Sequence, residues 1–251
     1  MLRGHLSYRH RDVFLFENTP ISYALCFDAL SEEDTLHGVL QSIRRHLGSA
    51  SAANNITLCG HSMGTCSLTW MIRCPEIKRR VRSVILLDPV SIMLSEPDVV
   101  VNFLYTRRDL ADPYEGSRNS WFGKIIRVFN ETKIHLVASS EMFIEFYLRR
   151  SFSWYNSELW LEDIPPDVKV VVCVAEHDEI VNATKIEREI DLHNAKVAKK
   201  PCHGASVDKI IWRDVGHAHC VMNPERWRDV HLAMAEVESQ IQRDLMRTKA
   251  Q

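Results

Sequence analysis

The hydrophobic positions of the chain gather into short runs that are separated by amphipathic stretches. Four of these runs are apolar almost throughout, which is typical of strands buried on both faces of a parallel sheet. An earlier run, residues 12–16, suits a short buried strand better than a helix and predicts one more strand. The four main runs cover residues 56–59, 83–87, 168–174 and 209–212.

Between these runs, apolar residues recur with the spacing of helices. In one such stretch the apolar positions fall at 36, 39, 40 and 43, and the hydroxyl of Ser31 is expected to cap the first turn. Helices are also expected over residues 63–73 and 224–246, whereas residues 193–206 predict a long surface loop. Strands that alternate with helices predict an α/β fold with a mostly parallel central sheet and helices on both faces.

Residues 95–160 break this alternation. They contain no run typical of a buried strand, yet more than half of the aromatic residues lie there. We expect a helical cap inserted above the sheet, within a single domain of residues 1–251. The aromatic side chains of such a cap form a small core of their own or wall an apolar substrate pocket.

Composition and charge exclude several classes of function. The 251 residues carry a formal net charge of -2 and an isoelectric point near 6.6, so no broad attraction to nucleic acid is expected. The seven cysteines are an odd, scattered set, unlike the disulfide framework of a small secreted protein. No signal-peptide core is evident, and no run reaches the roughly 20 apolar residues of a membrane span. We therefore expect a cytoplasmic protein without an integral membrane segment.

The sequence GHSMG, residues 60–64, has the pattern G-x-S-x-G and lies between a predicted strand and a predicted helix. A serine at such a corner is held in a strained backbone conformation that exposes its hydroxyl at the sheet edge. The flanking glycines leave room for strand and helix to approach each other. Ser62 is therefore the candidate nucleophile, and the N–H of Met63 is the candidate donor to an oxyanion.

A serine nucleophile needs a base and a carboxylate that orients the base. The segment AEHDEIV follows the strongest strand signal, and its Asp178 is the preferred carboxylate. Asp88, directly after the preceding apolar run, is the alternative. Glu176 and Glu179 are interpreted as surface charges.

The histidine is expected in a loop after the last strand. The segment DVGHAH offers His217 and His219, of which His217 is preferred because it follows a glycine and lies nearer the strand. A rival hypothesis is a zinc site formed by His217, His219 and Cys220 with the Cys202-His203 pair. Because no C-x-x-C pair or HExxH helix accompanies these residues, no metal is expected.

With these motifs in place, the chain from about Asp12 onward resembles the α/β-hydrolase fold family. The resemblance is carried by GHSMG, AEHDEIV and VGHAH, and LDP with PDVVVNFLY is similar to eukaryotic members that have a helical cap. It implies hydrolysis of esters, thioesters, amides or lactones through an acyl-enzyme, without a cofactor. Because the nucleophile is serine and not aspartate, the dehalogenase and epoxide hydrolase branches are disfavoured. The expected partner is a small acyl substrate of apolar character.

The chain departs from this family at its beginning. Family members carry three strands and a His-Gly loop before the segment equivalent to residues 12–16, and that loop supplies a second oxyanion donor. No apolar strand precedes Arg3-Gly4-His5, so we do not assign that role to it. Loss of one such donor costs about 3 kcal/mol in the barrier. The sequence therefore predicts an incomplete form, a replacement donor or impaired activity, and a binding protein without turnover is the second functional hypothesis.

Overall fold

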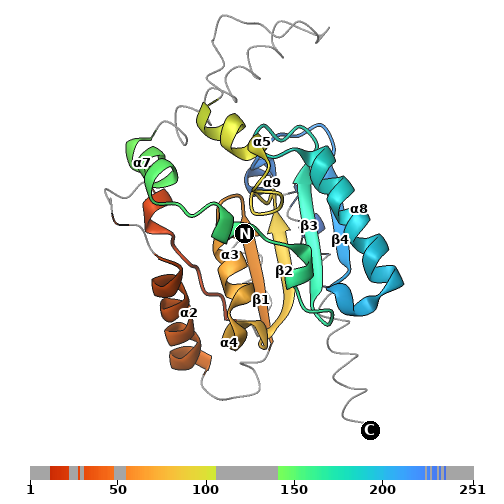
Figure 1. Cartoon of the computed structure of the whole chain (residues 1–251), viewed down its shortest axis with the longest axis horizontal. Helices are drawn as coiled ribbons and strands as arrows, with labels where there is room; N and C mark the ends of the chain where they lie inside the picture. The colour runs from red at the N-terminus through yellow and green to blue at the C-terminus, as the bar shows by residue number, and fades with distance from the viewer. Residues whose placement is uncertain are drawn as a thin grey trace, which may run out of the picture.

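The computed structural model describes residues 12–22, 28, 31–47, 55–105, 141–223, 225–226, 228–230, 232 and 235. Its centre is a four-stranded sheet with the strand order β1-β2-β3-β4, and all three neighbouring pairs are parallel (Figure 1). This topology confirms the predicted α/β class. The strands are β1 (Ile56–His61), β2 (Val81–Leu87), β3 (Lys169–Ala175) and β4 (Val207–Trp212).

Helices and single turns connect the strands in an order that follows the chain. The main helices are α2 (Glu32–Leu47), α3 (Gly64–Arg73), α7 (Met142–Arg150) and α8 (Ala183–Lys199). The shorter α-helices are α4 (Pro75–Lys78), α5 (Pro97–Val100) and α9 (His219–Met222). The remaining turns are η1 (Thr19–Ile21), the π-helix η3 (Val101–Tyr105), η5 (Tyr155–Ser157), η6 (Leu161–Asp163) and η7 (Pro201–His203).

The sheet is buried on both faces, as its continuous apolar strands predict. Alternate residues of β2 and β3 belong to two separate core clusters. One cluster includes the apolar faces of α3 and α8, which lie on the near side of the sheet in Figure 1. The other, on the opposite face, includes Trp212, Val215 and Val230. Each fully buried aliphatic side chain contributes roughly 1.5–3 kcal/mol, so the two clusters fix the strands from both sides.

The register brings the carboxyl ends of the strands to one edge. His61 is paired with Leu87, Leu87 with Cys173, and Ala175 with Trp212. The turns that leave β1, β2, β3 and β4 therefore start close together. This edge collects the polar residues that the sequence analysis singled out.

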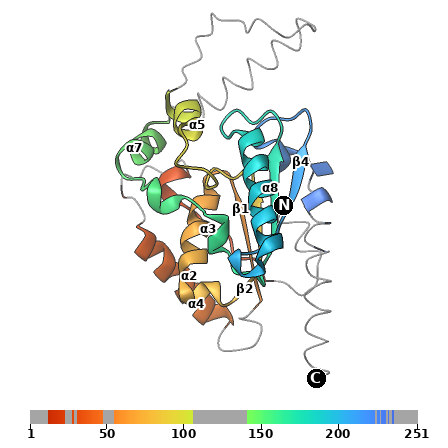
Figure 2. The same cartoon turned by 45° about the vertical axis from the view of Figure 1, so that its right-hand side comes forward.

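The described parts of residues 95–160 contain helices and turns and no strand, while residues 106–140 lie outside the described residues. Both views place α5 beyond the carboxyl ends of the strands (Figures 1 and 2). Arg149 of α7 donates to the carbonyl of Leu104 at 3.0 Å, and its guanidinium lies 4.7 Å from the centre of the Tyr105 ring. Because these contacts join α7 to η3, the two described ends of the predicted cap pack against each other.

The predicted capping of the first turn of α2 by Ser31 is confirmed. The Ser31 Oγ accepts the N–H of Asp34 at 3.0 Å, and the Ser31 hydroxyl donates to the Asp34 carboxylate at 2.7 Å. The predicted terminal helix over residues 224–246 falls mostly outside the described residues, but those described between 225 and 235 are helical. None of the described helices has the length and apolar character that a membrane crossing requires.

The prediction of a buried strand over residues 12–16 is wrong. The segment has no regular secondary structure, its apolar side chains are exposed, and Leu15 is 80% exposed. A strand is stabilised by backbone pairing, and within the described residues this segment belongs to no sheet. A short apolar run indicates that a segment is hydrophobic, but it does not indicate whether another strand lies beside it to pair with.

The predicted surface loop over residues 193–206 is wrong in its first half. Helix α8 continues to Lys199, and His193 is fully buried with its Nε2 2.8 Å from the carbonyl oxygen of Ala205. His193 continues the buried face of Ile186 and Ile190 at helical spacing. The sequence analysis missed this periodicity because the buried position is a histidine in a stretch rich in charged residues.

Candidate active site

Ser62 occupies the corner between β1 and α3, as its motif predicts. Its φ of 51° lies in the left-handed region, which costs a residue other than glycine roughly 1–3 kcal/mol. Its N–H donates to the carbonyl of Leu87 at 2.9 Å, and the Thr65 hydroxyl donates to the Ser62 carbonyl at 2.6 Å. The strained conformation is therefore held by hydrogen bonds on both sides of the residue.

The two glycines of the motif have different surroundings. A Cβ on Gly60 would lie 2.8 Å from Leu68 Cδ1 and 3.2 Å from the carbonyl oxygen of Gly64. The close approach of β1 and α3 therefore requires glycine at position 60, as predicted. At Gly64 a Cβ would meet nothing within 4 Å among the described residues, so the same explanation is wrong there.

Met63 begins the turn that leads into α3, with helical backbone angles and no side-chain cap. Among the described residues, its N–H has no hydrogen-bond acceptor. Free N–H groups at the start of a helix attract negative charge, because the helix dipole has its positive end there. The position predicted for an oxyanion donor is thus a free donor beside Ser62.

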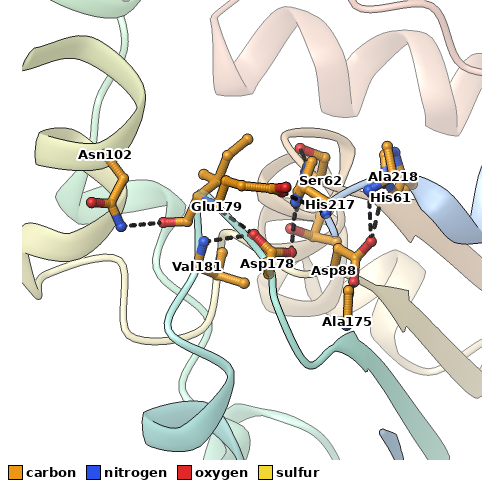
Figure 3. A network of polar contacts seen from close by, with 12 residues as sticks. His61, Ser62, Asp88, Asn102, Ala175, Asp178, Glu179, Val181, His217 and Ala218 are labelled. Carbon is orange, nitrogen blue, oxygen red and sulfur yellow. Dashed lines mark hydrogen bonds and ion pairs between the residues drawn. The ribbon is translucent and has the colours of Figure 1, made fainter. Parts of the chain in front are cut away.

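The structure brings the three predicted catalytic side chains into one hydrogen-bonded chain (Figure 3). His217 Nε2 lies 2.8 Å from Ser62 Oγ, and His217 Nδ1 lies 2.7 Å from Asp178 Oδ2. The side chains of His217 and Asp178 are 5% and 0% exposed. The carboxylate can only accept, so Nδ1 carries a proton and Nε2 is left to accept the serine proton.

Asp178 is held by the turn that carries it. Its second oxygen, Oδ1, accepts the N–H groups of Ile180 and Val181 at 2.8 and 2.9 Å. The side-chain amide of Asn102, in η3, donates to the carbonyl of Ile180 at 3.1 Å. The predicted cap therefore contacts the acid-bearing turn directly, and the carboxylate has a fixed direction toward His217.

Carboxylates dominate the electrostatics of His217. Burial of the imidazole lowers its pKa, but the charge and hydrogen bond of Asp178, together with the charges of Asp88 and Glu179, outweigh this effect. The net pKa of His217 is raised above its ordinary value. The protonated imidazole that forms when a base accepts a proton is thus stabilised at this site.

Asp88, the alternative acid, lies in the same cluster but does not take the orienting position. It is fully buried, and its oxygens accept the N–H groups of Ala175 at 2.8 Å and Ala218 at 3.0 Å. Burial raises its pKa, and the negative charge of Asp178 raises it further. Asp88 therefore joins the end of β3 to the histidine loop through backbone groups.

His61, which precedes the nucleophile, is a neutral neighbour of this cluster. Burial and the charge of His217 lower its pKa to about 3. Its ring centre is 5.3 Å from that of His217, and its Nε2 is 3.8 Å from Asp88 Oδ2. Because the imidazole is uncharged at neutral pH, the contact with Asp88 is not an ion pair under those conditions.

Glu179 is the residue of this site that the sequence analysis missed. Its Oε2 accepts the backbone N–H of His217 at 2.8 Å, so the interpretation as a surface charge is wrong. Its position beside Asp178 does not distinguish it from Glu176, which instead pairs with Arg213 at the surface. Glu176 also accepts the backbone N–H of Asp214 at 3.1 Å, so only the fold shows which of the two acids bonds to His217 itself.

The alternative histidine, His219, is exposed at the start of α9. Within the described residues, two groups have metal-ligating atoms within 4.8 Å of one another, and neither includes His219. They are Asp88 with Asp178 and His217, and Glu176 with His177 and Asp214. The side chain of Cys220 lies outside the described residues. The expectation that the protein binds no metal stays a prediction.

A hollow of about 450 Å³ with mostly apolar walls lies between α5, η3 and η5. Its lining includes Tyr105, Trp154 and Tyr155, which belong to the aromatic residues of the predicted cap. None of the three catalytic candidates contributes to this lining. The prediction that cap aromatics wall the substrate pocket of Ser62 therefore stays a prediction.

Comparison with known proteins finds likeness in solved structures alone. No family model matches the chain, and no curated protein matches its sequence. It is similar to an esterase from Pyrobaculum calidifontis, with 16% identity, a TM-score of 0.47 and coverage of 84% of this chain. The chain spans 60% of the length of that esterase.

Two further solved structures have a comparable likeness. An α/β superfamily hydrolase from Oenococcus oeni is 15% identical with a TM-score of 0.46, over 84% of this chain and 77% of that protein. A lipase, named as putative, from Acinetobacter baumannii is 13% identical with a TM-score of 0.45, over 87% and 71%.

Proposed function

We propose that the protein is a serine hydrolase that cleaves a carboxylic ester, thioester or lactone through an acyl-enzyme. The observation that carries this proposal is the hydrogen-bonded chain from Ser62 Oγ through His217 to Asp178, with distances of 2.8 and 2.7 Å. A nucleophile, a base and an orienting acid at hydrogen-bond distance are what acyl transfer to serine requires.

In the first half-reaction, Ser62 Oγ forms a bond to the substrate carbonyl carbon while its proton passes to His217 Nε2. The carbonyl π electrons move onto oxygen, and the N–H of Met63 donates to that oxyanion. When the tetrahedral intermediate collapses, the bond to the leaving group breaks and His217 returns the proton to it. Asp178 holds Nδ1–H throughout, which keeps Nε2 available.

In the second half-reaction, water replaces the leaving group. His217 removes a proton from the water as its oxygen attacks the acyl carbon, and it then protonates Ser62 Oγ as the acyl-enzyme bond breaks. This cycle releases the carboxylic acid and restores the free serine. Apart from the substrate and water, the proposed cycle uses three side chains and the backbone N–H of Met63.

A fluorophosphonate probe tests the proposal, because it reacts with activated serines. The wild-type protein is expected to label at Ser62, and Ser62→Ala is expected to abolish labelling. Ser151, exposed at the end of α7, offers the matched control, and Ser151→Ala should label like wild type. A folded wild-type protein that does not label contradicts the proposal and favours the binding protein without turnover.

A panel of nitrophenyl esters of increasing chain length tests the substrate class. If the acyl group is apolar, kcat/KM should rise with chain length, by at most about 0.8 kcal/mol of binding for each buried CH₂ group. Hydrolysis of short esters alone would contradict the expectation of an apolar acyl substrate. It would leave the acyl-enzyme mechanism intact.

A further inference from the structure

The main chain of the histidine loop is held by two carboxylates that are not part of the catalytic chain. Glu179 Oε2 accepts the N–H of His217 at 2.8 Å, and Asp88 Oδ2 accepts the N–H of the next residue, Ala218, at 3.0 Å. Ala218 has a φ of 62°, a left-handed conformation that alanine rarely adopts. Two consecutive peptide groups are thus fixed in addition to the imidazole, as Figure 3 shows.

Gly216 provides independent evidence that this arrangement is built into the chain. A Cβ at this position would overlap with Glu179 Oε1 and would lie 2.8 Å from Oε2. Gly216 does not have a positive φ, so its backbone conformation accepts an L side chain. A side chain at position 216 would therefore not strain the backbone but would displace the Glu179 carboxylate from the N–H of His217.

We propose that Glu179 is a positioning residue for His217, and that glycine at position 216 leaves room for the Glu179 carboxylate to reach the N–H of His217. The inference rests on the proposed role of His217 as the general base. Glu179 acts in two ways: its oxygen fixes the peptide group that carries the imidazole, and its charge favours the protonated ring. It does not touch the reacting atoms.

The sign of the charge effect follows from the groups that face His217. These are the carboxylates of Asp178, Asp88 and Glu179, the neutral ring of His61 and the hydroxyl of Ser62. Removal of one negative charge makes the imidazolium less stable, so His217 loses its proton at lower pH. The acid limb of any reaction that needs neutral His217 then moves to lower pH.

Two substitutions separate the two effects. Glu179→Gln keeps an oxygen that accepts the His217 N–H but removes the charge, whereas Glu179→Ala removes both. The rate of fluorophosphonate labelling at Ser62 is measured from pH 5 to pH 9. For Glu179→Gln, the ratio of its rate to that of wild type should be roughly threefold higher on the acid limb than at the plateau. Glu179→Ala should show the same shift and a plateau roughly tenfold lower.

Gly216→Ala tests the packing between Gly216 and Glu179. In the wild-type background the new Cβ displaces the Glu179 carboxylate, and the labelling rate should fall roughly tenfold. In the Glu179→Ala background there is no carboxylate to displace, so the same substitution should cause no further loss. An equal loss in both backgrounds would overturn the proposed coupling.

Glu176→Gln is the matched control, because Glu176 lies in the same turn and accepts a backbone N–H, that of Asp214, but has no contact with His217. It should leave both the plateau and the acid limb unchanged. If wild-type protein does not label at all, the proposed function fails. A different outcome refutes only the positioning role of Glu179. In that case wild type labels, Glu179→Gln keeps the wild-type pH profile and Glu179→Ala keeps the wild-type plateau, and the proposed function stands.

Discussion

The turns that follow β2 and β3 both carry an aspartate with a buried side chain at the same edge of the sheet, yet the two carboxylates have different partners. Asp88 directly follows β2, and both of its oxygens accept backbone N–H groups of other segments. Asp178 lies three residues after β3, and only one of its oxygens is used by backbone, within its own turn. The other oxygen contacts the imidazole of His217.

This difference shows that residue type and place in the fold do not decide which aspartate orients the base. Ligand atoms of Asp88, Asp178 and His217 all lie within 4.8 Å of one another. What separates the two acids is whether an oxygen is left over after the backbone donors are satisfied. One oxygen of Asp178 accepts no backbone N–H and contacts His217. Each oxygen of Asp88 accepts a backbone N–H.

Asp178→Asn should have the largest effect. Its carbonyl oxygen can still accept the N–H groups of Ile180 and Val181, so its NH₂ group is directed at His217 Nδ1. The imidazole must then accept at Nδ1 and carry its proton on Nε2, where it cannot take the proton of Ser62. Labelling of Ser62 should fall by about 10⁴-fold with little loss of stability. A loss below tenfold in a quantitative labelling assay would show that Asp178 is not the orienting acid.

Asp88→Asn should have the opposite profile, with a large effect on stability and a smaller one on rate. One of its two oxygens becomes an NH₂ group that faces an N–H donor, so the N–H of Ala175 or of Ala218 loses its acceptor. The free energy of unfolding should fall by about 2–3 kcal/mol. Urea denaturation measures this loss, and the labelling rate should fall less than for Asp178→Asn. A stable variant that fails to label would reverse the roles of the two aspartates.

The sequence predicted the parts of this site that depend on local pattern. The four strands of the sheet, the corner at Ser62 and the placement of Asp178 and His217 after strands follow from apolar runs and from the spacing of motifs. Parallel strands bring their carboxyl ends to one edge, which is enough to expect these side chains to meet. The order of these motifs along the sequence was therefore enough to predict the three catalytic candidates.

The parts that were missed depend on contacts between distant segments. The role of Glu179 requires knowledge that its carboxylate lies against Gly216, which is far away in the sequence. The exposed run at residues 12–16 has the composition of a strand and lacks a partner within the described residues. His193 has a polar side chain in a fully buried position. No local pattern contains such information.

The pH dependence of Ser62 labelling tests how the charges of the two aspartates act on His217. Since the pKa of His217 is raised, the acid limb of wild-type labelling should have its midpoint above the ordinary histidine value of about 6.5. Asp88 does not hold the imidazole, but its charge contributes to this shift. Asp88→Asn should therefore move the limb to lower pH while the protein stays folded. A wild-type midpoint below the ordinary value would contradict the dominance of the carboxylates.

His61→Gln should have the smallest effect, and it tests whether Asp88 has an ionic partner. Folded His61 has a pKa of about 3, whereas the unfolded chain binds a proton near pH 6.5. Between these values the unfolded state holds more protons, so wild-type stability falls as the pH falls. The substitution should cost less than about 1 kcal/mol at pH 7, and between pH 7 and pH 5 the variant should gain about 2 kcal/mol relative to wild type. Urea denaturation at the two pH values measures the free energy of unfolding. If His61 and Asp88 formed an ion pair, the loss of stability in the variant would instead be largest at pH 5.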